Sequence, residues 1–277
     1  MNKYNFMGYI DRDSIIHKLT GKTKLILLLI FSIIGGISFD TRVLLLFATL
    51  SIILFLFSKI KFKEIKIMLI FFITFMFLNI FLTYIIMPTQ GCIIYQSTTI
   101  LFSFSERYVV TAEHLFYILN VLLKYIITFP IALLFILTTN PSEFASSLNT
   151  IKISYKICYS VSLALRYIPD ILKEYNEISM SQQAKGVQLG KNVKLSQRVK
   201  NSCSILFPIV LSSINRIETV TNAMELRGFG KYSKRTWYIK RDLSKFDILL
   251  LSIIVILFIL GLIITFYDGN RFFNPFI

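Results

Sequence analysis

Acidic residues, cysteine and histidine are all scarce in this chain. Its 277 residues include 15 Asp and Glu against 30 Lys and Arg, with three cysteines and two histidines. Cys92, Cys158 and Cys203 form no CxxC pair and no even set, which argues against a disulfide framework and a thiolate metal site. His17 and His114 are too far apart in sequence to suggest a metal pair. We therefore expect neither a metal nor a cofactor.

Catalytic motifs are missing as well. The stretch GFGKYS at 228–233 contains a glycine–lysine pair, but it lacks the spacing and the preceding strand of a phosphate-binding loop. The polar part of the chain has no GxSxG, no HExxH and no paired-carboxylate constellation. Asp170, Glu174 and Glu177 share part of one helix surface, and solvation explains them best. We expect that the chain is not an enzyme.

Long hydrophobic runs dominate what is present. Hydrophobic residues make up 55% of the chain and charged residues 16%, which is too apolar for a soluble domain. One continuous helix over 25–57 would leave Asp40 and Arg42 near the middle of the membrane, which is costly. Two short helices would place both charges at an interface. We therefore predict an all-α polytopic membrane protein with about five spans, at 25–39, 43–57, 65–87, 115–137 and 248–267.

The cations are distributed unevenly between the ends of these spans. One side carries Lys3, Arg12, Lys18, Lys22 and Lys24 together with Lys59, Lys61, Lys63 and Lys66. The other side carries only Arg42, Arg107 and Arg271. By the positive-inside rule, the N-terminus is cytoplasmic and the C-terminus external. The net charge of +15 is then explained by topology and the anionic lipid bilayer, so nucleic acid is not an expected partner.

Some polar features lie within or between the spans. Lys124 and Asn79 fall inside predicted spans, where a polar side chain either serves function or stabilises helix packing. Pro130 is expected to kink its span. The external connection at 88–113 alternates partly between apolar and polar residues, which favours a short hairpin or a re-entrant flap.

The region 138–245 is predicted to be cytoplasmic and to contain no run of transmembrane length. TTNPSEFASSL opens a first helix, with Pro141 near its first position. Two amphipathic helices follow, and their apolar residues recur at spacings of three and four. We thus divide the chain into a membrane domain at 1–137, a cytoplasmic helical domain at 138–245, and a C-terminal transmembrane helix with an external tail at 246–277.

Both amphipathic helices end in a cation followed by glycine. Gly186 and Gly228 are suited to the left-handed cap position, and Lys185 and Arg227 complement the negative end of the helix dipole. Small flanking residues would let another surface approach closely. The matched endings suggest two docking plugs for two similar partner subunits. The predicted docking residues are Ala184, Lys185, Gly186, Leu226, Arg227 and Gly228, with Arg216 and Glu218 as possible helix-pairing groups.

Several segments resemble one family over nearly the whole chain. SIIHKLTGKTKLILLL is similar to the N-terminal signature of the transmembrane T component of energy-coupling factor (ECF) transporters, bacterial ATP-driven importers of vitamins and transition-metal ions. His17, Leu19, Thr23, Lys24 and Leu25 agree with that signature, while Thr20, Gly21 and Lys22 depart from it. TTNPSEFASSL resembles the segment after the last span of the family's N-terminal bundle. ALRYIPDILKEYNEISMSQQAKG and INRIETVTNAMELRGFG resemble its two coupling helices, whose family endings are Ala-Arg-Gly.

This resemblance implies a non-catalytic coupling subunit in the bacterial cell membrane. Its two helix endings would dock on two ABC-type ATPase subunits, or on a homodimer, and it would also contact a substrate-binding S component. Both endings depart from the family pattern: Lys185 keeps the charge without the planar guanidinium fork, and Leu226 replaces a small residue.

Three other functions stay open at this point. The alternative reading is a permease subunit of another ABC-type transporter that contacts substrate itself. A subunit that itself binds the vitamin is disfavoured by the long cytoplasmic region. A membrane-embedded enzyme would need convergent acidic or histidine residues at the span ends, and none is evident.

Overall fold

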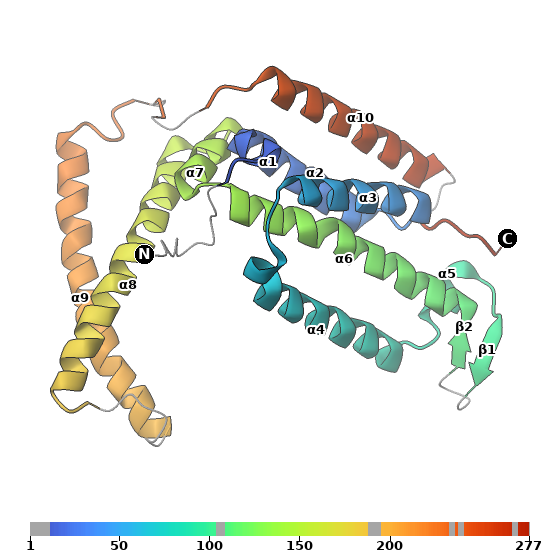
Figure 1. Ribbon diagram of the computed structural model, residues 1–277, viewed down its shortest axis with the longest axis horizontal. Coiled ribbons are helices and arrows are strands. Elements are labelled where there is room, and N and C mark those ends of the chain that lie inside the picture. Colours follow the sequence, from blue (N-terminus) through green and yellow to red (C-terminus); the bar gives the residue numbers. More distant parts are fainter. Residues whose placement is uncertain are drawn as a thin grey trace. The chain divides into compact units, whose positions relative to one another are not determined.

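The chain folds into two compact units. The computed structural model describes residues 12–103, 109–187, 195–232, 236–237, 241–267 and 271–276 (Figure 1). One unit, here called the membrane unit, comprises residues 7–139 and 241–277. The other, here called the α7–α9 unit, contains residues 140–240. The C-terminal helix thus belongs to the same unit as the first spans.

Helices make up almost all of both units, and the prediction of an all-α polytopic membrane protein is confirmed. The membrane unit contains α1 (Ile15–Lys18), α2 (Gly21–Ile37), α3 (Thr41–Phe57), α4 (Phe62–Ile86), α5 (Gln90–Tyr95), β1 (Ile100–Ser103), β2 (Val109–Thr111), α6 (Ala112–Thr138) and α10 (Lys245–Tyr267). The α7–α9 unit contains α7 (Pro141–Thr150), α8 (Tyr155–Ala184) and α9 (Leu195–Leu226).

The predicted break within 25–57 is confirmed, because α2 ends at Ile37 and α3 begins at Thr41. Asp40 is the N-cap of α3, and its Oδ1 accepts a hydrogen bond from the Arg42 backbone N–H at 2.9 Å. The Arg42 guanidinium also binds the Asp40 carboxylate, at 2.8 Å. Each charge therefore has a partner at a helix start, where an acidic cap is favourable.

Helix α6 packs against α2 and α3, and α10 packs against α2 (Figure 1). Lipid tails are as apolar as leucine, so these helices associate through close packing and interhelical hydrogen bonds. A methyl group on Gly35 would lie 3.1 Å from Thr128 Oγ1, and one on Gly261 would lie 3.2 Å from Val43 Cγ1. The core includes Phe31, Ile34, Leu44, Phe47, Ile127 and Ile131.

Two lysines connect helices inside this bundle. Lys24 is only 1% exposed, and its Nζ donates to the Thr138 carbonyl at 2.7 Å, joining the start of α2 to the end of α6. Lys124 Nζ lies 3.0 Å from the centre of the Phe39 ring and 3.4 Å from the Gly36 carbonyl oxygen. These contacts give Lys124 a packing role at the end of α2, where helix carbonyls carry partial negative charge.

Polar contacts define two opposite ends of the membrane unit. At one end, Arg12 binds Glu64 and the Lys59 carbonyl, and the Thr20 backbone N–H donates to Asp247 Oδ1 at 3.1 Å. At the other end, the Phe39 N–H donates to the Arg271 carbonyl, and Asn274 Nδ2 donates to the Tyr95 carbonyl at 2.9 Å. The two basic loops thus share one end. Lys3 and Arg107, which also entered the charge argument, lie outside the described residues.

The connection between α4 and α6 forms the predicted short hairpin. Strands β1 and β2 pair antiparallel, with Ile100 opposite Thr111 and Phe102 opposite Val110. Helix α5 precedes them and lies against the start of α6. A methyl group on Gly91 would lie 2.5 Å from the Glu113 backbone, so only glycine fits this approach.

One prediction about the polar region is wrong. Residues 138–245 were predicted to contain no run of transmembrane length, but α9 continues through Pro208 for 32 residues. By length and composition, the described helices that could cross a membrane are α4, α6, α10 and residues 199–226 of α9. The α9 window has a mean hydropathy of only 1.3, against 2.2 to 3.3 for the other three. Its alternation of apolar and polar residues explains the difference.

Candidate docking site

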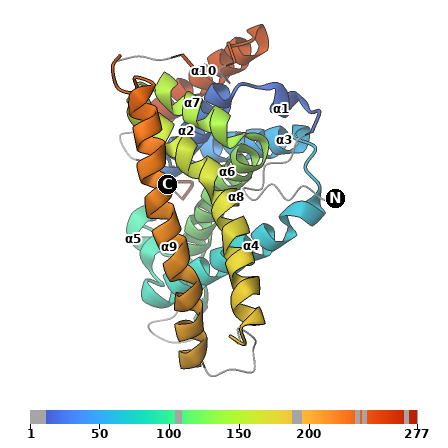
Figure 2. The same cartoon turned by 90° about the vertical axis from the view of Figure 1, so that its left-hand side faces the viewer.

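Helices α8 and α9 carry the predicted docking residues. They cross each other in Figure 1 and run alongside one another in Figure 2. Pro169 lies near the middle of α8, which begins at Tyr155, and Pro208 lies near the middle of α9, which begins at Leu195.

The end of α8 is closed by a glycine cap. Ala184 is the last helical residue, Lys185 is the C-cap, and Gly186 follows with a φ of 89°. The Gly186 N–H donates to the Gln183 carbonyl at 2.9 Å, and the Val187 N–H donates to the Gln182 carbonyl at 3.0 Å. This pair of bonds is the Schellman motif, which satisfies the last helix carbonyls.

The end of α9 repeats the same geometry. Leu226 is the last helical residue, Arg227 takes the place of Lys185, and Gly228 has a φ of 69°. The Gly228 N–H donates to the Glu225 carbonyl at 2.8 Å, and the Phe229 N–H donates to the Met224 carbonyl at 2.9 Å. The prediction of two left-handed glycine caps is confirmed, and the two cations occupy equivalent positions in them.

Both caps have exposed surroundings. Lys185 and Arg227 are exposed, and Leu226 is 89% exposed although it is a large apolar residue. Among the described residues, no atom of another segment lies within 4 Å of where a side chain on Gly186 or Gly228 would begin. Another protein surface could therefore approach each helix end closely.

Phe229 fixes the second cap in place. Its ring centre lies 5.7 Å from that of Tyr155 and 4.9 Å from that of Tyr159, both on the first turns of α8. The end of α9 thus lies beside the beginning of α8, and the two helices run antiparallel. Phe229 is not among the residues predicted from the sequence to form this site. Its place between two glycines was the feature of the sequence that could have pointed to it.

The antiparallel arrangement separates the two caps. From Tyr159 to Lys185, α8 rises by about 39 Å at 1.5 Å per residue. The cap after α9 lies near Tyr159, so the two cations are roughly 40 Å apart within the α7–α9 unit. They do not form one site.

A polar cluster joins α8 and α9 between the two caps. Arg216 Nη2 donates to Glu174 Oε2 at 2.7 Å, and the Arg216 guanidinium carbon lies 5.8 Å from the Tyr167 ring centre. A hydrogen bond from Ser212, and then the hydrogen bond and charge of Arg216, hold the pKa of Glu174 below its ordinary 4.5. Glu174 is therefore a pairing residue and not simply a solvated one. Glu218 is exposed and has no ion pair among the residues described.

A groove of about 420 Å³ lies between the same helices. Leu163, Tyr167 and Ile171 of α8 line it together with Ile217, Val220 and Met224 of α9. Ile217 is 65% exposed, and Val210 and Leu206 on α9 are about half exposed. The α7–α9 unit thus presents apolar side chains that its own helices do not cover, which is typical of an interaction surface.

The described residues offer no site for a metal ion, since no group of three or more His, Cys, Asp or Glu side chains is suitably placed. The candidate docking features are the two separate helix ends and the apolar groove between α8 and α9. These features suit contact with other proteins.

Comparison with known proteins decides the family. Residues 12–238 match the family model described as "CbiQ: Cobalt transport protein". The chain belongs to this family.

Curated relatives extend over nearly the whole length of this CbiQ-family chain. The Energy-coupling factor transporter transmembrane protein EcfT of Streptococcus equi subsp. equi is 27% identical over 93% of this chain and 95% of its own length. The proteins of the same name from Bacillus subtilis and Lactococcus lactis subsp. cremoris are 27% and 25% identical, over 93% and 90% of this chain and 96% and 95% of their own lengths. The chain is thus a transmembrane T component of an ECF transporter.

The N-terminal signature of this T component has a structural explanation. Thr20, which departs from the family signature, caps α2 by accepting from the N–H of the signature residue Thr23, while its own N–H donates to the buried Asp247 of α10. Lys24, one turn later, reaches the end of α6. The signature residue Lys24 therefore ties α2 to α6, and the backbone of Thr20 ties α2 to α10.

Proposed function

We propose that this T component couples ATP hydrolysis by partner ATPase subunits to solute import, without catalysing a reaction itself. The observation that carries the proposal is the repeated cap. Two helices end in the same Schellman geometry, with the exposed cations Lys185 and Arg227 at the same position, and a cation is the group that acidic side chains of a partner would bind.

The spacing of the caps supports two docking events. Ends that lie roughly 40 Å apart reach two separate grooves more readily than one. Their matched geometry fits two similar subunits, either two ABC-type ATPases or a homodimer. Movement of these subunits toward and away from each other would then be passed to α8 and α9.

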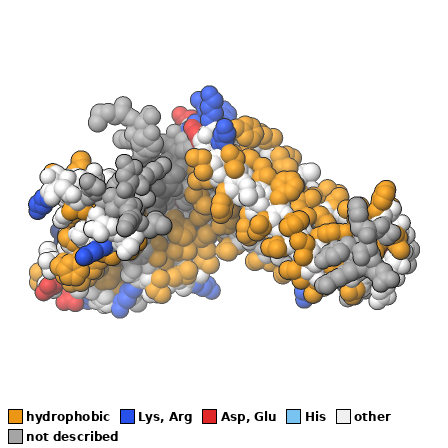
Figure 3. Space-filling view, turned by 90° about the horizontal axis from the view of Figure 1, so that it is seen from below, with side chains coloured by type: hydrophobic (Ala, Val, Ile, Leu, Met, Phe, Trp, Pro, Cys, Tyr) orange, Lys and Arg blue, Asp and Glu red, His pale blue; other side chains and the backbone are white. Residues whose placement is uncertain are grey.

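The apolar groove between α8 and α9 is proposed to receive the substrate-binding S component. Its lining is apolar except for Ser160, Ser213, Thr221 and Arg216, so an amphipathic helix could lay its apolar face there. Hydrophobic side chains also spread widely over the membrane unit, with few charged side chains between them (Figure 3). By family resemblance, the imported solute is a vitamin or a transition-metal ion.

Charge reversal at the second cap tests the docking proposal. Arg227→Glu should abolish ATP-driven uptake and co-purification of the ATPase subunits, because the helix end would repel acidic partner groups. Lys185→Arg should be tolerated, since it keeps the positive charge. Lys231→Glu is the matched control: Lys231 is exposed and near the same turn but outside the cap, so uptake should persist. If Arg227→Glu retains both uptake and ATPase association, docking through this cap is wrong.

A further inference from the structure

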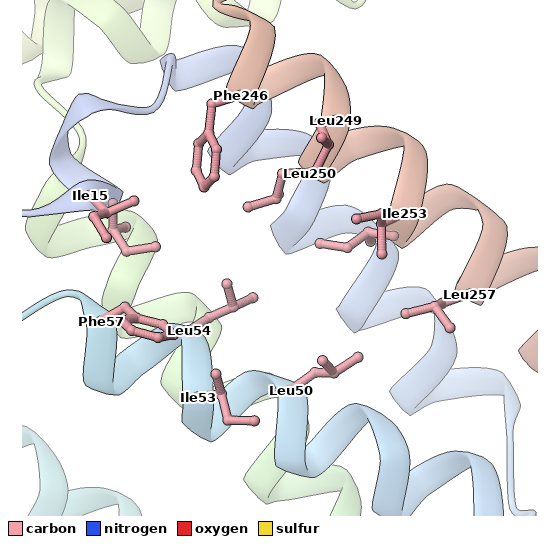
Figure 4. A pocket seen from close by; sticks show the side chains of 12 residues that line it. Ile15, Leu50, Ile53, Leu54, Phe57, Phe246, Leu249, Leu250, Ile253 and Leu257 are labelled. Atoms are coloured by element: carbon pink, nitrogen blue, oxygen red, sulfur yellow. The ribbon is translucent and has the colours of Figure 1, made fainter.

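An apolar groove opens between α1, α3 and α10 of the membrane unit (Figure 4). Its volume is about 340 Å³, and every side chain that lines it is Ile, Leu or Phe. Ile15 comes from α1, Leu54 and Phe57 from α3, and Phe246, Ile253 and Leu257 from α10. The groove is separate from the helix ends and the α8–α9 groove described above.

The length of the groove matches one leaflet of a bilayer. Phe246 and Leu257 are eleven positions apart on α10, which corresponds to about 16 Å of helix. The hydrocarbon core of a bilayer is about 30 Å thick, so one leaflet is about 15 Å. An elongated hydrocarbon-lined groove of this length fits a lipid acyl chain.

The groove begins at the basic end of the membrane unit. Figure 4 shows Ile15, Phe57 and Phe246 toward one end of the groove, and Ile253 and Leu257 further along it. That first end lies where α1 and α10 start and α3 finishes. Lys18, Lys59 and Lys245 are the exposed cations nearest in sequence to the three residues at that end.

Among the residues that the structure describes, few acidic side chains are available there to neutralise these lysines. Glu64 is held by Arg12, which also binds the Lys59 carbonyl. Asp247 is fully buried and accepts from Thr20 and Ser244. Asp13 and Asp242 are exposed, but they are outnumbered by the cations of α1, of the 58–66 loop and of 241–245.

Lys59 adds a conformational argument. Its φ is 56°, in the left-handed region that ends a helix most easily with glycine. A non-glycine residue in this conformation is strained, and such strain concentrates at functional positions. Lys59 thus holds a left-handed conformation that glycine would adopt more easily.

We propose that this groove binds one acyl chain of an anionic phospholipid, whose phosphate lies among Lys18, Lys59 and Lys245. The apolar lining supplies affinity for the chain, and the lysines supply the preference for an anionic headgroup. The bound lipid would fill the space between α3 and α10 at the basic end.

Photo-cross-linking tests the proposal in the complete transporter. The transporter is reconstituted in phosphatidylcholine vesicles that contain a trace of phosphatidylglycerol with a diazirine on its acyl chain, and the labelled peptides are identified by mass spectrometry. Labelling should concentrate on residues 50–57 and 246–257. It should exceed labelling by the matching phosphatidylcholine probe by at least about fivefold, the effect of about one lysine near an anionic lipid.

Two sets of variants distinguish binding of the lipid acyl chain from recognition of the lipid headgroup. Ile253→Trp should fill the groove and reduce labelling at least severalfold, whereas Ile256→Trp, on an exposed face of α10 outside the lining, should not. Lys59→Gly removes a charge at a position that glycine suits, and it should reduce the preference for phosphatidylglycerol about fivefold without unfolding the protein.

Three results would overturn the proposal. Equal labelling of the groove by both lipid probes would mean that it is filled by bulk lipid without headgroup preference. Labelling unchanged by Ile253→Trp would place the lipid elsewhere. If the groove is labelled by lipid in the isolated protein but not in the assembled transporter, a partner subunit covers it and the groove is a protein-docking surface instead.

Discussion

Glu174 and Arg216 show how single residues hold the two long helices together. The side chains are 18% and 33% exposed, so water screens the pair only in part. Arg216 also lies near the Tyr167 ring, and Ser212 supplies Glu174 with a further hydrogen bond. The pair fixes how α8 and α9 meet and, through them, the distance between the two caps.

Arg216→Met should destabilise the protein by about 1 kcal/mol at pH 7, because it removes a partly screened, charge-assisted hydrogen bond. The pKa of Glu174 is lowered in the folded protein, so the pair's contribution is fully present above the ordinary value of 4.5. It is lost as the pH falls through the folded pKa. Thermal unfolding in detergent at pH 7 and at acidic pH measures both effects.

Lys173→Met is the control for this experiment. Lys173 and Glu177 are 3.9 Å apart, on exposed side chains of one helix, so losing that pair should change stability little. The interpretation of Glu174 fails if the two variants have equal effects, or if the Arg216→Met difference does not shrink at acidic pH.

At the scale of helices, much of the architecture was predictable from sequence. Asp40 and Arg42 marked the break between α2 and α3 because charges are costly inside a bilayer. The Lys-Gly and Arg-Gly pairs marked the ends of α8 and α9 because glycine adopts left-handed conformations easily. Local chemistry was sufficient in both cases.

Other helix-scale features could not be predicted because they depend on tertiary contacts. The pairing of Arg216 with Glu174 and the packing of Phe229 on Tyr155 and Tyr159 need the antiparallel placement of two segments far apart in sequence. The separation of the caps follows from the same placement.

Gly228→Ala and Gly186→Ala test the cap geometry. Alanine in a left-handed conformation costs about 1 kcal/mol, so the last turn should rearrange and the adjacent cation should be displaced. We expect weaker ATPase co-purification in both variants. Gly36→Ala is the control, because Gly36 lies within α2, has no positive φ and has no neighbouring atom in the described structure within 4 Å of its added methyl group. Full ATPase binding by both cap variants would contradict the role of the left-handed turn.

At the scale of the whole molecule, the distribution of charge in the sequence agrees with the placement of the loops at the two ends of the membrane unit. The described basic loops gather at one end of the membrane unit, while the 38–40 loop, the β1–β2 hairpin region and the C-terminal segment lie at the other. The positive-inside rule then predicts that the N-terminus faces the cytoplasm and the C-terminus faces outward.

Cysteine labelling tests this orientation. In a background with Cys92, Cys158 and Cys203 replaced by Ser, Ile100→Cys in the hairpin should react with an impermeant maleimide added to intact cells. Lys61→Cys should react only after the membrane is permeabilised. Both positions are exposed in the structure, so accessibility depends on the side of the membrane. Labelling of position 61 from outside would reverse the topology.

The most direct test of the account is photo-cross-linking from the two helix ends in membranes that contain the complete transporter. A benzophenone amino acid at position 184 or 226 should attach to an ATPase subunit, because both positions are exposed at a capped end. The same group at position 218, exposed on α9 but away from its end, should not. Attachment at 184 and 226, but not at 218, would support docking through the paired caps. ATPase cross-links that are absent at 184 and 226, or equally strong at 218, would contradict it.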